Sequence, residues 1–111
     1  TFKNARKGFR LVLKSEMNIR IHVAIATFVV FMALFLKFSA VEFCLLLFVI
    51  GLVIVAEMLN TAIEFTLDSI YHNRYSRMVG MAKDISAGAV MFASFISVLV
   101  GIILFGNKLF F

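Results

Sequence analysis

Three long apolar stretches, separated by short polar segments, dominate the pattern of this chain. They predict membrane-spanning helices at about 19–36, 43–70 and 85–105, because about 20 apolar residues cross the hydrocarbon core of a bilayer. Ahead of them, over about 1–18, cationic side chains gather on one helical face and apolar side chains on the other. This pattern predicts an amphipathic helix on the membrane surface. We therefore expect an all-α membrane protein, a helical bundle in one domain over 1–111.

Within the second stretch, four polar side chains follow one another at helical spacing. Glu57, Asn60, Glu64 and Asp68 fall within roughly 80° of one another around a helix axis, on a single stripe. Ionisable groups at membrane depth are costly, and where they occur they usually serve a function. The stripe is therefore the main candidate for a functional site. The competing interpretation is a solvated or subunit-facing stripe on a helix that leaves the bilayer.

Composition supports the membrane assignment. The chain is 63% hydrophobic and 15% charged, with a mean hydropathy of +1.06, which is too apolar for a soluble domain of this length. The net charge of +5 comes mostly from the first twenty residues. A basic run of this kind also suits nucleic acid, but the residues that follow enter the bilayer, so we expect no nucleic-acid partner. The single Cys44 excludes an intramolecular disulfide.

The distribution of basic residues predicts the orientation. Nine lysines and arginines lie in 1–20 and 69–84, whereas only Lys37 and Lys108 lie on the other side. The side that is richer in these residues faces the cytoplasm, so we expect a cytoplasmic N-terminus. Measured from Phe43 on the outer side, Glu57 lies about 21 Å along the helix and Glu64 about 32 Å. Glu57 then lies in the inner leaflet, and Glu64 lies at the interface with water.

A reaction between a lipid and a water-soluble cosubstrate needs groups on both sides of this boundary. Glu57 is suited to accept a proton from a lipid hydroxyl, since partial burial raises the basicity of a carboxylate. Glu64 is suited to bind Mg²⁺, which prefers carboxylate and phosphate oxygens. Asn60, between them, can donate and accept hydrogen bonds. Glu16, at the start of the first span, is a candidate second carboxylate for the metal.

Lys83 and Asp84 precede the third span, where helix N–H groups and a lysine favour phosphate. Asp84 is expected to cap that helix. Simpler interpretations stay open for several of these residues: Lys83 as a snorkelling lysine, Glu16 as a charge that balances basic neighbours, and His22 as a packing or interfacial residue. Lys37 and Glu42 are interpreted as loop charges. The chain has no Walker A or kinase glycine-rich motif, so the nucleotide is only inferred.

A membrane transporter or channel is the alternative from another class, with the carboxylates as a cation or proton path. Such a path needs polar groups through the outer half of the bundle as well. The segments 23–36 and 43–56 contain almost none. A purely structural membrane adaptor is the third possibility.

Two motifs resemble those of the prokaryotic integral-membrane diacylglycerol kinase family. One is the run from Glu57 to Glu64, EMLNTAIE, with Asp68 four residues later. The other is AKDISAGAV, which begins at Ala82. The resemblance covers nearly the whole chain. Within the family, the run from Glu16 to His22 is similar to the Gram-positive branch that phosphorylates undecaprenol, whereas the diacylglycerol branch tends to have a carboxylate at position 22.

The resemblance implies a homotrimer in the bacterial plasma membrane that uses ATP and Mg²⁺ to phosphorylate a lipid alcohol, at sites shared between subunits. Undecaprenol is the expected substrate and diacylglycerol the alternative. By position, the implied roles are a general base that also contacts the lipid (Glu57), metal ligands that also contact ATP (Glu16 and Glu64), further nucleotide contacts (Asn60, Asp68, Lys83, Asp84 and Arg6), and further lipid contacts (Asn60 and Arg10). Tyr75–Ser76 and Phe65–Leu67 depart from the usual family pattern, which affects loop contacts and lipid preference.

Overall fold

The computed structural model describes residues 1–72, 74 and 76–110, and the described residues form four helices and no strand. Their bounds are α1 Phe2–Ser15, α2 Met17–Phe35, α3 Ala40–Tyr71 and α4 Arg77–Phe110. The all-α fold predicted from the sequence is confirmed. Tyr75, one of the departures from the family pattern, lies outside the described residues.

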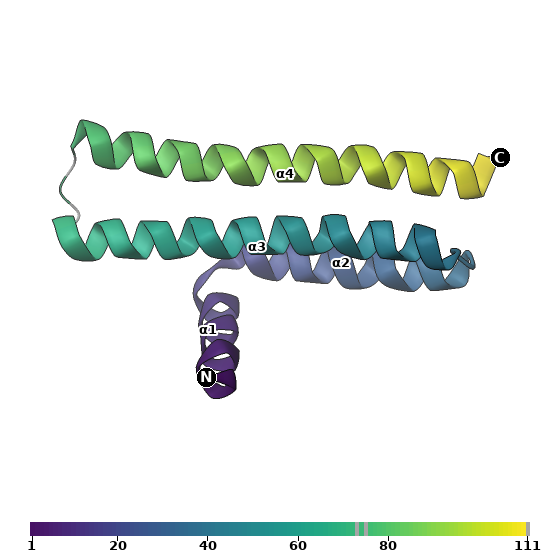
Figure 1. Ribbon diagram of the computed structural model, residues 1–111, viewed down its shortest axis with the longest axis horizontal. Helices are drawn as coiled ribbons and strands as arrows, with labels where there is room; N and C mark the ends of the chain where they lie inside the picture. Colours follow the sequence, from purple (N-terminus) through teal and green to yellow (C-terminus); the bar gives the residue numbers. More distant parts are fainter. Residues whose placement is uncertain (73, 75, 111) are drawn as a thin grey trace.

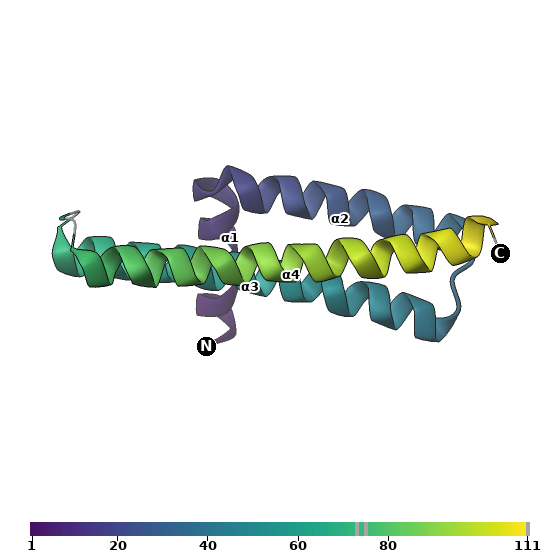
Figure 2. The same ribbon diagram turned by 90° about the horizontal axis from the view of Figure 1, so that it is seen from above.

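Helices α2, α3 and α4 run alongside one another, and α1 lies across them near the start of α2 (Figure 1). Seen from above, α3 and α4 continue past the N-terminal end of α2 toward the segment that joins them (Figure 2). Each of the three long helices is long and apolar enough to cross a membrane. The three predicted spans are therefore confirmed, and α1 has the position expected of a helix on the membrane surface.

The start of α4 differs from the sequence prediction. The helix begins at Arg77 rather than near residue 85, because Ser76 caps it: the Ser76 hydroxyl accepts a hydrogen bond from the Val79 N–H at 3.1 Å. A cap of this kind satisfies one of the free N–H groups of the first turn, so a helix can begin ahead of its apolar run. The prediction that Asp84 caps this helix is therefore wrong. Lys83 and Asp84 lie in its second turn, beyond the free N–H groups.

The turn between α2 and α3 corrects a second prediction. Glu42 lies inside α3 and not in a loop, where it completes a capping box: Ser39 N–H donates to Glu42 at 2.8 Å, and Glu42 N–H donates to the Ser39 hydroxyl at 3.2 Å. Lys37 ends α2 with a left-handed backbone, φ 59°, and Phe38 N–H then bonds back to the Ala33 carbonyl at 3.1 Å. These bonds fix a tight turn.

Packing within one chain is sparse. The buried apolar cluster is small, consisting of Ala33, Leu46 and Leu104 with partly buried neighbours. The most extensive interhelical contact joins α3 to α4. Large apolar side chains such as Phe28, Phe48 and Phe95 are more than 60% exposed, which suits surfaces that meet lipid tails or other subunits.

Candidate active site

Glu57 is the deepest charged side chain of the stripe. It lies on α3 and is 6% exposed. Its Oε1 atom lies 3.2 Å from His22 Nε2, on the facing side of α2. Helix α2 therefore contributes a polar contact to the stripe. A purely packing or interfacial His22 would not make this contact.

One turn further along α3, Asn60 connects two helices. Its side-chain N–H donates to Glu64 Oε1 at 3.2 Å, one turn along the same helix. Its carbonyl oxygen accepts a hydrogen bond at 2.6 Å from the hydroxyl of Ser86, on α4. Ser86 is 7% exposed and also lies 3.0 Å from the Lys83 carbonyl. Since Ser86 donates to the carbonyl oxygen of Asn60, the amide is oriented with its N–H toward Glu64.

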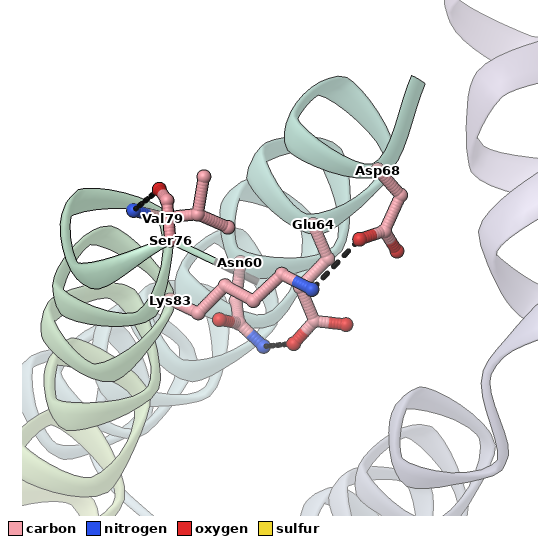
Figure 3. Close-up of polar contacts among 6 residues, drawn as sticks. All are labelled: Asn60, Glu64, Asp68, Ser76, Val79 and Lys83. Atoms are coloured by element: carbon pink, nitrogen blue, oxygen red, sulfur yellow. Dashed lines mark hydrogen bonds and ion pairs between the residues drawn. The ribbon is translucent and has the colours of Figure 1, made fainter. Parts of the chain in front are cut away.

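Lys83 supplies the positive charge of this region. Its side chain extends from α4 across the stripe on α3, and its ammonium nitrogen lies 2.7 Å from Asp68 Oδ1 (Figure 3). Both side chains are more than a third exposed. An ammonium group has three donors, so this contact leaves lysine donors for a phosphate.

Exposure increases along the stripe in the predicted direction. Glu57 is buried, whereas Asn60, Glu64 and Asp68 are half-buried. The side chains from Asn60 onward lie on the face of α3 that meets α4 (Figure 3). The sequence-predicted stripe is therefore continuous, with its buried end beside α2 and its more exposed end beside α4.

The remaining candidates are not brought into contact with the stripe within one chain. Glu16 is half-buried at the junction of α1 and α2, and among the described residues no hydrogen bond or ion pair joins it to Glu64. Arg6 and Arg10 are exposed on α1, and Asp84 is exposed on α4. The roles of these four residues stay predictions.

The carboxylates at the more exposed end of the stripe suit Mg²⁺. In the part of the chain that the structure describes, no three His, Cys, Asp or Glu side chains gather around a common point. Mg²⁺ commonly takes only one or two carboxylates and completes its six oxygens with phosphate and water. Asn60 donates to Oε1 of Glu64, which leaves Oε2 and further lone pairs for a cation. The residues present therefore fit a metal that arrives with a nucleotide.

An apolar cavity of about 300 Å³ lies between α2, α3 and α4. His22 lines it near one end, and Phe105 lines it near the other. Most of its other lining side chains are aliphatic, among them Val29 and Ile50. The imidazole that contacts Glu57 thus also borders a mostly apolar cavity.

Two residues of this site were missed or misread in the sequence. Ser86 was not singled out in the sequence, although its place within AKDISAGAV was a signal that could have found it. His22 lies on a different helix from Glu57, so no helical spacing relates the two. Its position among apolar residues of the first span was the only signal.

Comparison with known proteins decides which family has this arrangement. The family model described as prokaryotic diacylglycerol kinase matches residues 3–105. The chain belongs to the prokaryotic diacylglycerol kinase family. The match covers α1 from Lys3 onward, all of α2 and α3, α4 as far as Phe105, and every residue of the stripe.

Curated relatives of this kinase agree on a lipid substrate. Undecaprenol kinase of Bacillus subtilis (strain 168) is 33% identical over 109 residues, which cover 98% of this chain and 88% of the relative. Diacylglycerol kinase of Escherichia coli (strain K12) is 33% identical over 98 residues, 88% of this chain and 80% of the relative. Diacylglycerol kinase of Synechocystis sp. is 33% identical over 101 residues, 91% of this chain but 58% of that longer protein.

The protein is therefore a multi-pass membrane protein and a lipid kinase, and it uses ATP as its family does. The recognition of the family from its two sequence motifs is confirmed. Membership of a lipid kinase family therefore favours the kinase over the transporter and the adaptor. The relatives are named for two different lipid alcohols, so family membership leaves the lipid open.

Proposed function

We propose that this kinase transfers the γ-phosphoryl group of ATP to undecaprenol at the cytoplasmic face of the membrane, with Glu57 as the general base. Diacylglycerol is the alternative substrate. The observation that carries the proposal is the polar stripe of α3, whose carboxylates pass from a buried position at Glu57 to half-buried positions at Glu64 and Asp68. A lipid hydroxyl and a nucleotide need such a graded site, since one substrate stays in the bilayer and the other stays in water.

The lipid end of the site is assigned to Glu57. Glu57 is the most buried carboxylate of the stripe, and its partner His22 borders the apolar cavity. The cavity beside His22 offers apolar walls to the chain of a lipid alcohol. Most of the residues around it are aliphatic, which suits a long hydrocarbon chain. Both candidate lipids have long hydrocarbon chains and one free hydroxyl, so the preference for undecaprenol over diacylglycerol rests on the resemblance to the undecaprenol branch.

The nucleotide end is assigned to the half-buried part of the stripe. Glu64 and Glu16 are the proposed Mg²⁺ ligands, and Mg²⁺ neutralises phosphate charge when it is bound. Lys83 is the proposed cation for the phosphates, with Asn60 and Asp68 beside it. Asp84 and Arg6 are proposed further nucleotide contacts. Arg10, together with Asn60, is a proposed contact for the lipid headgroup.

The proposed reaction is a direct transfer of the γ-phosphoryl group from ATP to the lipid hydroxyl. The Glu57 carboxylate takes the proton of the lipid hydroxyl, the hydroxyl oxygen forms a bond to the γ-phosphorus, and the bond from that phosphorus to the β,γ-bridging oxygen breaks. ADP leaves with the electron pair of the broken bond. Positioning and charge neutralisation supply most of the rate enhancement in phosphoryl transfer. Lys83 and Asn60 contribute to these two effects and undergo no covalent change.

A homotrimer with shared sites is part of the proposal. Within one chain Glu16 makes no described contact with Glu64, although both are proposed to bind one metal. A neighbouring subunit that supplies one of the two carboxylates accounts for this separation. The large exposed apolar side chains, such as Phe48 and Phe95, provide surfaces for such an assembly.

The test is an assay of purified protein with labelled ATP and Mg²⁺, with undecaprenol or diacylglycerol in parallel mixed micelles. The expected product is labelled undecaprenyl phosphate, formed faster than labelled phosphatidic acid. Glu57→Gln is expected to lower the rate at least about a hundredfold, since general-base catalysis contributes roughly that much or more. Full activity of Glu57→Gln contradicts the base assignment, and faster labelling of diacylglycerol contradicts the substrate assignment.

Glu42→Gln is the matched control. It makes the same chemical change on the same helix, at the end remote from the proposed site. Glutamine preserves the capping box, because its amide can occupy the same position. Wild-type activity is expected from this variant.

A further inference from the structure

The contact between His22 and Glu57 is the one polar interaction described between α2 and α3. Its two atoms, His22 Nε2 and Glu57 Oε1, lie 3.2 Å apart. The carboxylate is 8% exposed and the imidazole 31% exposed. His22 lies near the start of α2, and Glu57 lies near the middle of α3. Because the carboxylate side of this contact is largely buried, water has little access to replace the imidazole there.

The imidazole acts as a donor in this pair. A carboxylate only accepts hydrogen bonds, so the proton at this contact belongs to Nε2. The next polar side chain along the stripe, Asn60, is directed toward Glu64 and Ser86 rather than toward Glu57. Among the described residues, the His22 ring is therefore the group that can set the rotation of the Glu57 carboxylate.

The imidazole also borders the apolar cavity between the three spans. His22 lines this cavity and Glu57 does not, so the ring links the carboxylate to the apolar space. A hydroxyl that approaches from the apolar side therefore meets a carboxylate with one oxygen, Oε1, already engaged. The lone pairs of Oε2 are left to accept the hydroxyl proton. This arrangement selects both the oxygen and the direction for proton abstraction.

We infer that His22 is a positioning residue, which holds the Glu57 carboxylate so that one of its oxygens faces the lipid hydroxyl. The inference rests on the proposed function, because it takes Glu57 as the base. It adds to that function a residue of α2 that neither the stripe of α3 nor the metal ligands include. His22 itself undergoes no covalent change and does not need to contact the nucleotide.

The first experiment compares His22→Leu with His22→Gln in the labelled-ATP assay. Leucine removes the donor while keeping an apolar side chain. Glutamine has an amide nitrogen at a reach similar to that of Nε2. We expect His22→Leu to lower kcat by about tenfold or more, since a hydrogen bond to a charged group contributes at least this much. The KM for ATP is expected to stay unchanged, and His22→Gln is expected to recover most of kcat.

A double-mutant cycle supplies a readout that a structural role does not change. Glu57→Asp shortens the side chain and withdraws the carboxylate from the imidazole. In the Glu57→Asp background, His22→Leu is expected to cost less than about twofold, because coupled residues are non-additive. His72→Asn is the control for the other histidine of the chain. His72 is exposed and has a left-handed backbone that asparagine tolerates.

The outcomes separate the inference from the proposed function. If wild-type protein phosphorylates neither lipid, the proposed function fails first. If the wild type is active and Glu57→Gln is not, three results overturn the inference alone: wild-type kcat in His22→Leu, equal losses in His22→Leu and His22→Gln, or an equal loss from His22→Leu in both backgrounds. Gel filtration and thermal unfolding in detergent identify a misfolded variant. If His22→Leu is misfolded, the kcat of folded His22→Gln decides. A kcat near that of the wild type supports the inference, and a tenfold loss overturns it.

Discussion

Replacing Ser86 by alanine is expected to loosen α3 from α4 and to disorient Asn60. The Ser86 hydroxyl donates a hydrogen bond to Asn60, with 2.6 Å between Ser86 Oγ and Asn60 Oδ1. This bond joins α4 to α3 in the buried part of their contact. The residue is 7% exposed, so water cannot readily take the place of the lost hydroxyl. The carbonyl oxygen of Asn60 then lacks its donor.

The magnitude follows from the setting of this bond. Hydrogen bonds between membrane helices contribute about 0.6 kcal/mol on average and at most about 1.7 kcal/mol. The bond is short, and its loss leaves a half-buried acceptor unpaired, which places the expected cost in the upper half of this range. We therefore expect Ser86→Ala to lower the free energy of unfolding by about 1 kcal/mol. If the same amount, about 1 kcal/mol, is lost from the orientation of Asn60 that favours ATP binding, the KM for ATP is expected to rise about fivefold.

The stability change is measured by unfolding the protein with SDS in mixed micelles, followed by circular dichroism. Ser94→Ala is the matched control. It makes the same change on the same helix, at a half-buried hydroxyl that lines the cavity. In an Asn60→Ala background, Ser86→Ala is expected to add little, because its partner is already gone. The reasoning is refuted if the cost of Ser86→Ala exceeds that of Ser94→Ala by less than about 0.3 kcal/mol, the margin within which effects at independent sites add.

Two further predictions concern the ion pairs at the two ends of α4. Lys83→Met is expected to raise the KM for ATP about tenfold or more. The loss of stability is expected to stay below about 1 kcal/mol, since the pair of Lys83 with Asp68 is more than a third exposed. A labelled-ATP titration and thermal unfolding check this, and an unchanged KM removes Lys83 from the phosphate site. Lys108→Met is expected to lower the midpoint of thermal unfolding without changing the phosphorylation rate, because its 2.9 Å contact with Glu42 lies at the other end of the bundle; a lower rate in folded protein contradicts this separation of the two ends.

Local periodicity predicted most of the fold. Apolar runs long enough to span a bilayer are a property of the chain itself, and α2, α3 and α4 all contain the predicted spans. The helix boundaries were less predictable. Helix α4 starts at Arg77 because of a single serine cap, and hydropathy cannot detect a helical segment that lies outside the apolar run.

The stripe of Glu57, Asn60, Glu64 and Asp68 was determined by sequence alone, because a helix repeats its faces every 3.6 residues. Residues within one helix obey that period wherever the helix lies. No such rule relates residues of different helices. The pairing of His22 with Glu57 depends on how far α2 slides along α3, and the pairing of Ser86 with Asn60 depends on the register of α4. Those two registers are set by side-chain packing between the helices, so only the tertiary structure decided which groups orient the base and the amide.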